Sequence, residues 1–203
     1  MAERDDNFLR TGDLVTFKYV RFQAFLTGEG ILSEDVSVSP KISSFEDHLF
    51  QVCAQRQYSA KLEYEDFLAK TDGGNNLDEA AKKHYSALVR GKGNEIRMNE
   101  VYMKHKIGNN ALFGDTVQLL HIKSRKYLTV KPGAVARDER ENMTVYLSSE
   151  GDQYSWIQLL PRYKIDREGD RILSNSEAYL RIAERPNEYI HAADKTPKFG
   201  YEK

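Results

Sequence analysis

The chain has 203 residues and a formal net charge of −1 at pH 7, because 30 basic side chains nearly cancel 31 acidic ones. This balance excludes the basic footprint of a nucleic-acid-binding domain, and no nucleic-acid partner is expected. A composition of 40% hydrophobic and 30% charged residues is typical of an ordinary soluble protein with one sizeable domain. The single cysteine, Cys53, favours a reducing compartment, and no apolar run is long enough for membrane insertion by this segment.

Residues 8–55 contain short apolar stretches, LVTF, FLT, VSV and LFQVC, separated by turn residues. Stretches of this length and spacing are typical of strands in an all-β domain. The same pattern of short apolar stretches recurs over residues 112–192, with TVQLLHI, KYLTV, TVYL, SWIQLL and AYLRI. The sequence therefore predicts two blocks of β-structure.

Residues 57–107 between these blocks change to a helical period. Leu62, Tyr64 and Phe67 have helical spacing, and TDGGNN then breaks the helix, with Asn76 as a candidate N-cap. A second helical stretch follows and is interrupted by GKG at residues 91–93 before a third. We expect an inserted arm of two or three helices, which either decorates the surface or contacts a partner.

One sequence pattern is repeated in both predicted blocks of β-structure. GDTVQLLHIKSRKYLTV at residues 114–130 repeats the pattern of GDLVTFKYVRFQAFLTG at residues 12–28, and GDRILSNSEAYLRI at residues 169–182 is a third, shorter copy. Each copy opens a set of strand candidates, so three four-strand units predict a β-trefoil with a helical insertion. The predicted core positions are Val15, Leu26, Phe50, Val117, Leu128, Trp156, Ile172 and Leu180. The third unit has only a poor fourth strand in residues 196–203, so we expect the domain over 1–203 to lack its last strand.

No arrangement of residues in the sequence indicates an enzyme. The five histidines have no metal-ligand spacing, and Cys53 has no partner for a zinc site. Residues 166–177 place acids in a calcium-loop register, but Arg171 stands where such a loop needs glycine. No catalytic residue, cofactor or metal is expected. The basic cluster of Lys123, Arg125, Lys126 and Lys131 is either a solvated hairpin or a site for a phosphate or an acidic surface.

The ordered motifs FLRTGD, LFQVC, QYSAK, TVQLLHIKSRKYLTV and SWIQLLPRYKI closely resemble the N-terminal domain of inositol trisphosphate receptors, over about residues 8–192. Ryanodine receptors are more distantly similar. The resemblance implies a β-trefoil with a protruding helical arm, called the suppressor domain. In that family the domain lowers the ligand affinity of the adjacent ligand-binding core and couples binding to the gate of a calcium channel at the endoplasmic reticulum. The inositol trisphosphate site itself lies outside this segment.

The same resemblance implies partners and interface residues. The partners would be the adjacent ligand-binding core, neighbouring subunits of a homotetrameric channel, and cytosolic regulators such as calmodulin. Tyr163 matches an exposed tyrosine used for suppression and subunit contact. Lys123 matches a lysine of the interface with the core, and Ile31 and Leu32 match an apolar loop there.

Three acidic residues depart from the family pattern on this surface. Glu29 replaces an apolar residue, while Asp35 and Glu46 stand where other members carry arginine. These departures suggest a rewired interface.

An alternative is a MIR-like trefoil module that binds carbohydrate or accompanies a glycosyltransferase. Such a module would line a sugar pocket with aromatic side chains in each unit. The single tryptophan, Trp156, at a core-type position, and the long helical insertion both weigh against it.

Overall fold

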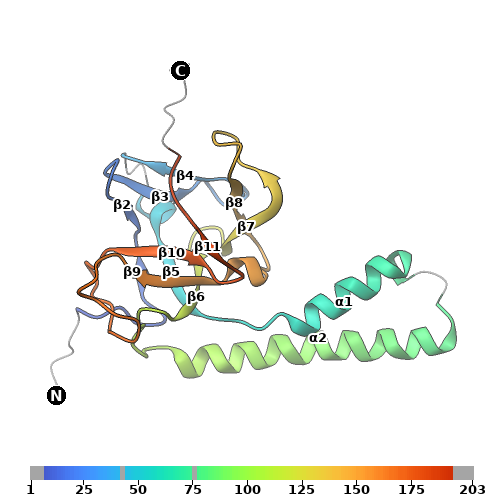
Figure 1. The fold of residues 1–203 in the computed structure, drawn as a ribbon. Helices are drawn as coiled ribbons and strands as arrows, with labels where there is room; N and C mark the ends of the chain where they lie inside the picture. The colour runs from blue at the N-terminus through green and yellow to red at the C-terminus, as the bar shows by residue number, and fades with distance from the viewer. Residues whose placement is uncertain (1–6, 42–43, 75–76, 194–203) are drawn as a thin grey trace. The chain divides into compact units, whose positions relative to one another are not determined.

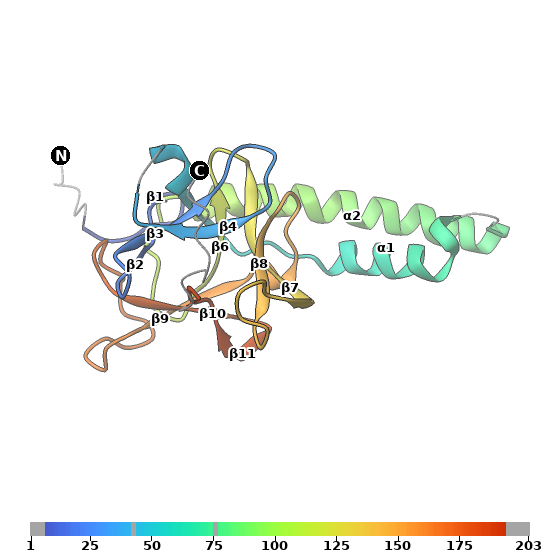
Figure 2. The ribbon, with the colours of Figure 1, turned by 90° about the horizontal axis from the view of Figure 1, so that it is seen from above.

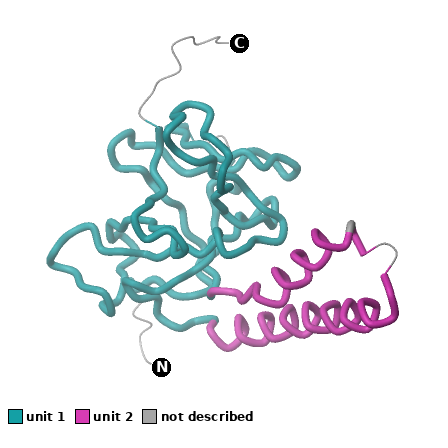
Figure 3. The backbone as a smooth tube through the Cα atoms, turned by 45° about the vertical axis from the view of Figure 1, so that its right-hand side comes forward, with its two compact units in different colours: residues 1–54, 107–203 teal, residues 55–106 magenta. Residues whose placement is uncertain are grey.

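The structure is a computed structural model that describes residues 7–41, 44–74 and 77–193. The chain divides into two compact units, which Figure 3 shows in teal and magenta. Unit 1 contains residues 1–54 and 107–203, and unit 2 contains residues 55–106. Unit 1 is mainly β, whereas both α-helices of the described residues belong to unit 2.

Unit 1 is built from short antiparallel strands, labelled in Figures 1 and 2. They are β1 (Leu14–Val15), β2 (Lys18–Tyr19), β3 (Ala24–Gly28), β4 (Val36–Ser39), β5 (Phe50–Ala54), β6 (Thr116–His121), β7 (Lys126–Val135), β8 (Met143–Ser148), β9 (Ile157–Pro161), β10 (Ala178–Ile182) and β11 (Arg185–Tyr189). One sheet follows the order β1-β5-β6-β9-β10-β11, with β7 paired to β6 and β8 paired to β7. The second sheet has the order β2-β3-β4. The short 3-10 helices η1 (Phe45–His48) and η3 (Gln153–Ser155) precede β5 and β9.

The repeated Gly-Asp pairs make the same turn three times. The amides of Gly12, Gly114 and Gly169, all with positive φ near 95°, donate to main-chain carbonyls of other segments. Each following aspartate accepts a hydrogen bond from the amide three residues before it, at 2.8 Å in all three copies. Only glycine adopts this φ readily, and aspartate closes such a turn with its own side chain. The repeated Gly-Asp motif of the sequence therefore forms the same backbone turn in each copy.

The core of unit 1 takes most of the positions predicted for it. Phe50, Val117, Leu128 and Ile172 are buried in one hydrophobic cluster. Val15, Leu26 and Leu180 are partly buried and pack against that cluster. The alternation of strand side chains puts these residues on the inner face.

Trp156 corrects the predicted core by one position. Its side chain is only half-buried, and the neighbouring Ile157, at 0% exposure, occupies the core. A capping box between Asp152 and Ser155 starts η3, and Trp156 is the C-cap of this turn, so β9 begins at Ile157. The local turn therefore shifts which residue points inward.

The third copy of the repeat forms less regular structure than the other two. Its opening residues make only isolated bridges, Leu112 with Arg171 and Phe8 with Leu173, and regular pairing begins at β10. The weak fourth strand predicted within residues 196–203 lies outside the described residues.

Unit 2 is a pair of helices, α1 (Ser59–Lys70) and α2 (Glu79–Lys106), that run side by side in Figures 1 and 2. The predicted interruption at GKG is wrong, because α2 continues through Gly91 and Gly93. Each glycine costs about 1 kcal/mol in a helix, and packing against α1 outweighs that cost. The side chain of Asp78 caps α2 by accepting from the Ala81 amide at 2.7 Å, while the candidate cap Asn76 lies outside the described residues.

Polar side chains of α2 hold the start of unit 2 together. The Asn99 side chain, 7% exposed, accepts from the Gln57 amide and donates to the Gln57 carbonyl, both at 2.8 Å. Glu95 accepts from the amides of Ala60 and Lys61 and so caps the first turn of α1. Within the described residues, neither helix is long and apolar enough to cross a membrane.

Candidate interaction site on unit 1

The loop between β3 and β4, residues 29–35, presents two large apolar side chains to solvent. Leu32 is 91% exposed and Ile31 is 62% exposed. Gly30 has a φ of +73°, a backbone conformation that a side chain would strain, and it turns the chain just before these two residues. Adjacent exposed apolar side chains of this kind make the loop a candidate contact surface for a partner.

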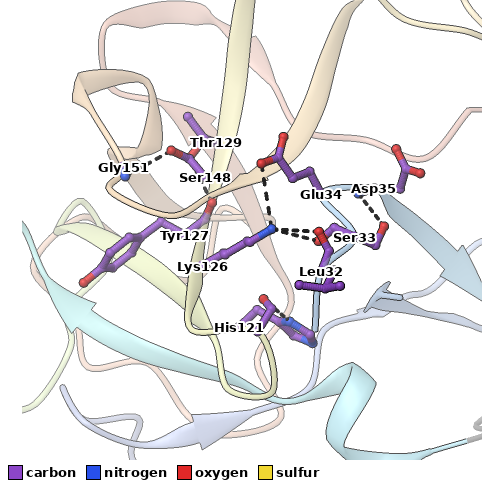
Figure 4. Close-up of polar contacts among 11 residues, drawn as sticks. Leu32, Ser33, Glu34, Asp35, His121, Lys126, Tyr127, Thr129, Ser148 and Gly151 are labelled. Carbon is purple, nitrogen blue, oxygen red and sulfur yellow. Dashed lines mark hydrogen bonds and ion pairs between the residues drawn. The ribbon is translucent and has the colours of Figure 1, made fainter. Parts of the chain in front are cut away.

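Lys126, the first residue of β7, holds the backbone of this loop in place. Its ammonium donates to the carbonyl oxygens of Leu32 at 3.0 Å and Ser33 at 3.3 Å, and it lies 3.8 Å from Glu34 Oε1 (Figure 4). The Lys126 side chain is only 15% exposed. A partly buried cation shared by two carbonyls and a carboxylate is a strong local tether, because charged donors form stronger hydrogen bonds. The apolar side chains at the tip are therefore exposed to solvent, while Lys126 holds the backbone that carries them.

The far side of the β3–β4 loop is tied to β8. The Leu147 amide donates to the Glu34 carbonyl at 2.8 Å, and Asp35 forms an isolated bridge with Tyr146. The Asp35 amide also donates to the Ser33 hydroxyl at 3.0 Å, which Figure 4 shows beside the Lys126 contacts. The backbone of the loop is therefore bonded to both β7 and β8.

Lys123 lies in the turn between β6 and β7, three residues before Lys126. Its side chain is 26% exposed, and its ammonium is 2.6 Å from Asp47 Oδ1 on η1. The Asp47 carbonyl in turn accepts from the Thr27 hydroxyl at 3.2 Å. Lys123 thus links the turn to η1 and to the end of β3, and its charge is compensated within the domain.

His121 lies buried under this surface, at 0% exposure. Its Nε2 is 3.1 Å from the Asp47 carbonyl, which can only accept, so we assign the proton to Nε2. Nδ1 then accepts from the Ser124 hydroxyl at 2.8 Å. Burial lowers the pKa of His121, and the Asp47 carbonyl opposes that shift only in part. The neutral ring acts as a structural strut between η1 and the turn.

Tyr163 lies on a different loop, the one that follows β9 (orange beside β9 in Figure 2). The ring is half-exposed, and its hydroxyl donates to Glu177 Oε2 at 3.1 Å. Arg162 pairs with the same Glu177 carboxylate, and its guanidinium carbon lies 5.5 Å from the centre of the Tyr163 ring. Among the contacts of the described residues, Tyr163 meets Glu177 and Arg162 and not the β3–β4 loop.

The structure thus brings Ile31 and Leu32 close to the turn that carries Lys123, and it leaves Tyr163 on a second surface. The resemblance did not single out Lys126 as a site residue. Its signal in the sequence was membership of a basic cluster that also fits a solvated hairpin. The contact itself spans 94 residues along the chain, and local patterns do not report such a separation.

The exposed charges around the tip are mainly acidic. Glu29, Glu34 and Asp35 are exposed on the loop, and Glu46 is exposed on η1. Residues 7–41, 44–74 and 77–193 contain no group of three or more His, Cys, Asp or Glu side chains placed to hold a metal ion. Apolar contact and charge complementarity are what this surface offers.

Comparison with known proteins places the chain in a family. The sequence model of the family described as "Inositol 1,4,5-trisphosphate/ryanodine receptor" matches residues 4–199. The inositol 1,4,5-trisphosphate receptor itr-1 of Caenorhabditis elegans is 33% identical over 145 residues, which are 67% of this chain and 5% of that receptor. The chain therefore spans a small part of the curated relative that it matches.

Two solved structures have a similar fold at low sequence identity. A Caenorhabditis elegans protein of unknown function matches with a TM-score of 0.59 and 13% identity, over 96% of this chain and 84% of that one. The SDF2-like protein of Arabidopsis thaliana matches with a TM-score of 0.58 and 14% identity, over 94% and 81% of the two chains. These likenesses concern the fold alone, whereas the family match covers nearly the whole chain, and the chain belongs to the inositol 1,4,5-trisphosphate/ryanodine receptor family.

Proposed function

We propose that this chain is the N-terminal regulatory, or suppressor, domain of an inositol trisphosphate-gated calcium-release channel at the cytosolic face of the endoplasmic reticulum. It is a non-catalytic domain that lowers the ligand affinity of the adjacent ligand-binding core. It couples ligand binding to gating through contacts with that core and with neighbouring subunits of a homotetramer. The observation that carries the proposal is Leu32, 91% exposed on a loop whose backbone Lys126 holds.

The energetics of this loop suit a regulatory contact. Burial of one leucine side chain is worth roughly 1.5 to 3 kcal/mol, and coupling between two sites in a protein is typically about 1–3 kcal/mol. A contact made by Leu32 in one state of the receptor and lost in the other would therefore supply coupling of the right size. Because Lys126 holds the loop, little conformational entropy is lost on docking.

The proposal takes unit 1 as a β-trefoil in which each unit contributes one Gly-Asp turn. Its support is the set of three equivalent turns, with the same φ and the same aspartate hydrogen bond in each copy. In this arrangement β1 and β6 open the first and second units. Ile31 and Leu32 belong to the first unit and Tyr163 follows the second, so two surfaces are free to serve two contacts.

The test compares inositol trisphosphate affinity of the parent receptor with and without residues 1–203. Removal is expected to raise the affinity by about 5- to 150-fold, the range that a coupling of 1–3 kcal/mol spans. Leu32→Ser in the whole receptor is expected to give part of the same increase. Equal affinities with and without residues 1–203, together with unchanged channel gating, would exclude a suppressor role.

A matched control for the Leu32 variant is Val135→Ser. Val135 is 61% exposed at the end of β7 opposite to Lys126, so it tests the loss of an exposed aliphatic side chain outside both proposed contact loops. We expect Val135→Ser to leave inositol trisphosphate affinity unchanged. An equal effect of both variants would show that the β3–β4 loop has no special role in suppression.

A further inference from the structure

The β3–β4 loop combines an apolar tip with an acidic surround. Its sequence from residue 29 to residue 35 is EGILSED, with three acidic residues and no basic one. Glu46, on η1, adds an exposed carboxylate beside Asp47, which holds the turn of Lys123. We call this surface the acidic-apolar patch, and its members are Glu29, Ile31, Leu32, Glu34, Asp35 and Glu46.

The cations nearest to the patch do not reverse its charge. Lys126 is 15% exposed and is bonded to the loop carbonyls, and Lys123 is 26% exposed and is paired with Asp47. Arg125 is exposed at the tip of the turn and supplies the remaining positive charge. The four acids of the patch and Asp47 therefore stand against these three basic residues, two of which already serve internal contacts. This count leaves an excess of two negative charges around the loop.

We infer that the surface which receives this loop is an apolar pocket rimmed by lysine or arginine side chains. The inference rests on the proposed function, because it describes the partner of the same contact. A pocket that buries Leu32 must approach the carboxylates of Glu29 and Asp35 on the same loop. Burying or crowding these carboxylates against a neutral or acidic rim would cost free energy, whereas a basic rim compensates them.

The charged rim sets specificity more than it sets affinity. Leu32 supplies the buried area, and each exposed ion pair changes the affinity by only about 1.4- to 5-fold. Rim pairs of this kind are screened by salt, because the Debye length falls from about 10 Å at 0.1 M to about 3 Å at 1 M. Affinity that depends on ionic strength is therefore the signature that separates a basic rim from a purely apolar contact.

The experiment uses the whole receptor and two acid-to-lysine substitutions, Asp35→Lys and Glu46→Lys, combined in one variant. The quantity measured is the ratio of inositol trisphosphate dissociation constants with and without residues 1–203, at low and high salt. Taking this ratio cancels the effect of salt on the ligand itself. We expect the double variant to lower the ratio by about 3- to 10-fold at low salt, with a smaller difference at high salt.

A matched control is Glu184→Lys, which reverses an exposed acid in the turn between β10 and β11, outside the patch. It is expected to leave the ratio unchanged at both salt concentrations. In the 203-residue chain, whose single tryptophan is Trp156, unfolding followed by fluorescence checks that each substitution leaves the fold intact.

The outcomes separate this inference from the proposed function. If Leu32→Ser relieves suppression but Asp35→Lys with Glu46→Lys does not, the contact exists and the basic rim is wrong. A tighter contact in the lysine variant would likewise overturn the inference, because it would indicate an acidic partner. If neither Leu32→Ser nor removal of residues 1–203 changes the affinity, the proposed function itself fails.

Discussion

Gly28→Ala is expected to destabilise unit 1, although alanine is normally the better strand residue. Gly28 is the last residue of β3, directly before the β3–β4 loop. A Cβ atom at this position would lie 2.7 Å from Leu147 Cδ1 and 3.1 Å from His121 Cε1. Leu147 and His121 are both at 0% exposure, so neither side chain has open space to enter.

The expected cost follows from these distances. Carbon atoms in contact prefer about 3.5–4.0 Å, so Leu147 Cδ1 must move by roughly 0.8 Å or more in a packed core. Overpacking of this kind typically costs about 1–3 kcal/mol. Replacing glycine by alanine recovers about 0.5–1 kcal/mol of backbone entropy, which is the smaller effect. We therefore expect a net loss of about 1–2 kcal/mol.

The assay is guanidinium unfolding followed by the fluorescence of Trp156, the single tryptophan, which lies in unit 1 directly before β9. A loss of 1–2 kcal/mol also lowers the midpoint temperature by about 2–8 °C for a chain of this size. Leu147→Val removes the clashing methyl group, so it should cost less in the Gly28→Ala background than alone, by at least about 0.5 kcal/mol. Unchanged or raised stability of Gly28→Ala, or strict additivity with Leu147→Val, would refute the packing argument.

Four further predictions concern other parts of the chain. Burial lowers the pKa of His121, so just below pH 6.5 the unfolded chain binds a proton that the folded chain resists. The free energy of unfolding should therefore decrease as the pH falls below 6.5, and His121→Gln should flatten this dependence of stability on pH. Gly91→Ala with Gly93→Ala should stabilise α2 by up to about 2 kcal/mol, because neither added methyl group meets an atom closer than 3.9 Å, and hydrogen exchange within α2 should slow. Asn99→Ala leaves a main-chain amide and carbonyl without their partner, and circular dichroism should show a loss of about 1–3 kcal/mol in unit 2; no loss would mean that water replaces the side chain. Asp115→Ala removes the acceptor in one Gly-Asp turn and should cost about 0.5–1.5 kcal/mol by denaturant unfolding, whereas an unchanged midpoint would show that the backbone alone holds the turn.

The sequence determined the elements whose cause is local. The Gly-Asp turns recur because each needs a glycine at positive φ and an aspartate that bonds to the amide three residues before it. Strand alternation placed Phe50, Val117 and Leu128 in the core, and helical periodicity identified residues 57–107 as a helical arm. Each of these signals lies within a few residues of the chain, where spacing and residue type are sufficient.

Other features were decided only by tertiary contacts. The two glycines in α2 read as a break, but packing against α1 carries the helix through them. Trp156 read as core, but the capped turn before it gives that place to Ile157. Lys126 read as one cation of a hairpin, yet it holds a loop 94 residues away and so gives Leu32 its exposed, fixed position. Periodicity specifies which face of an element is apolar, whereas the distance between two elements, and hence the partner of a buried charge, is set by how the whole chain packs.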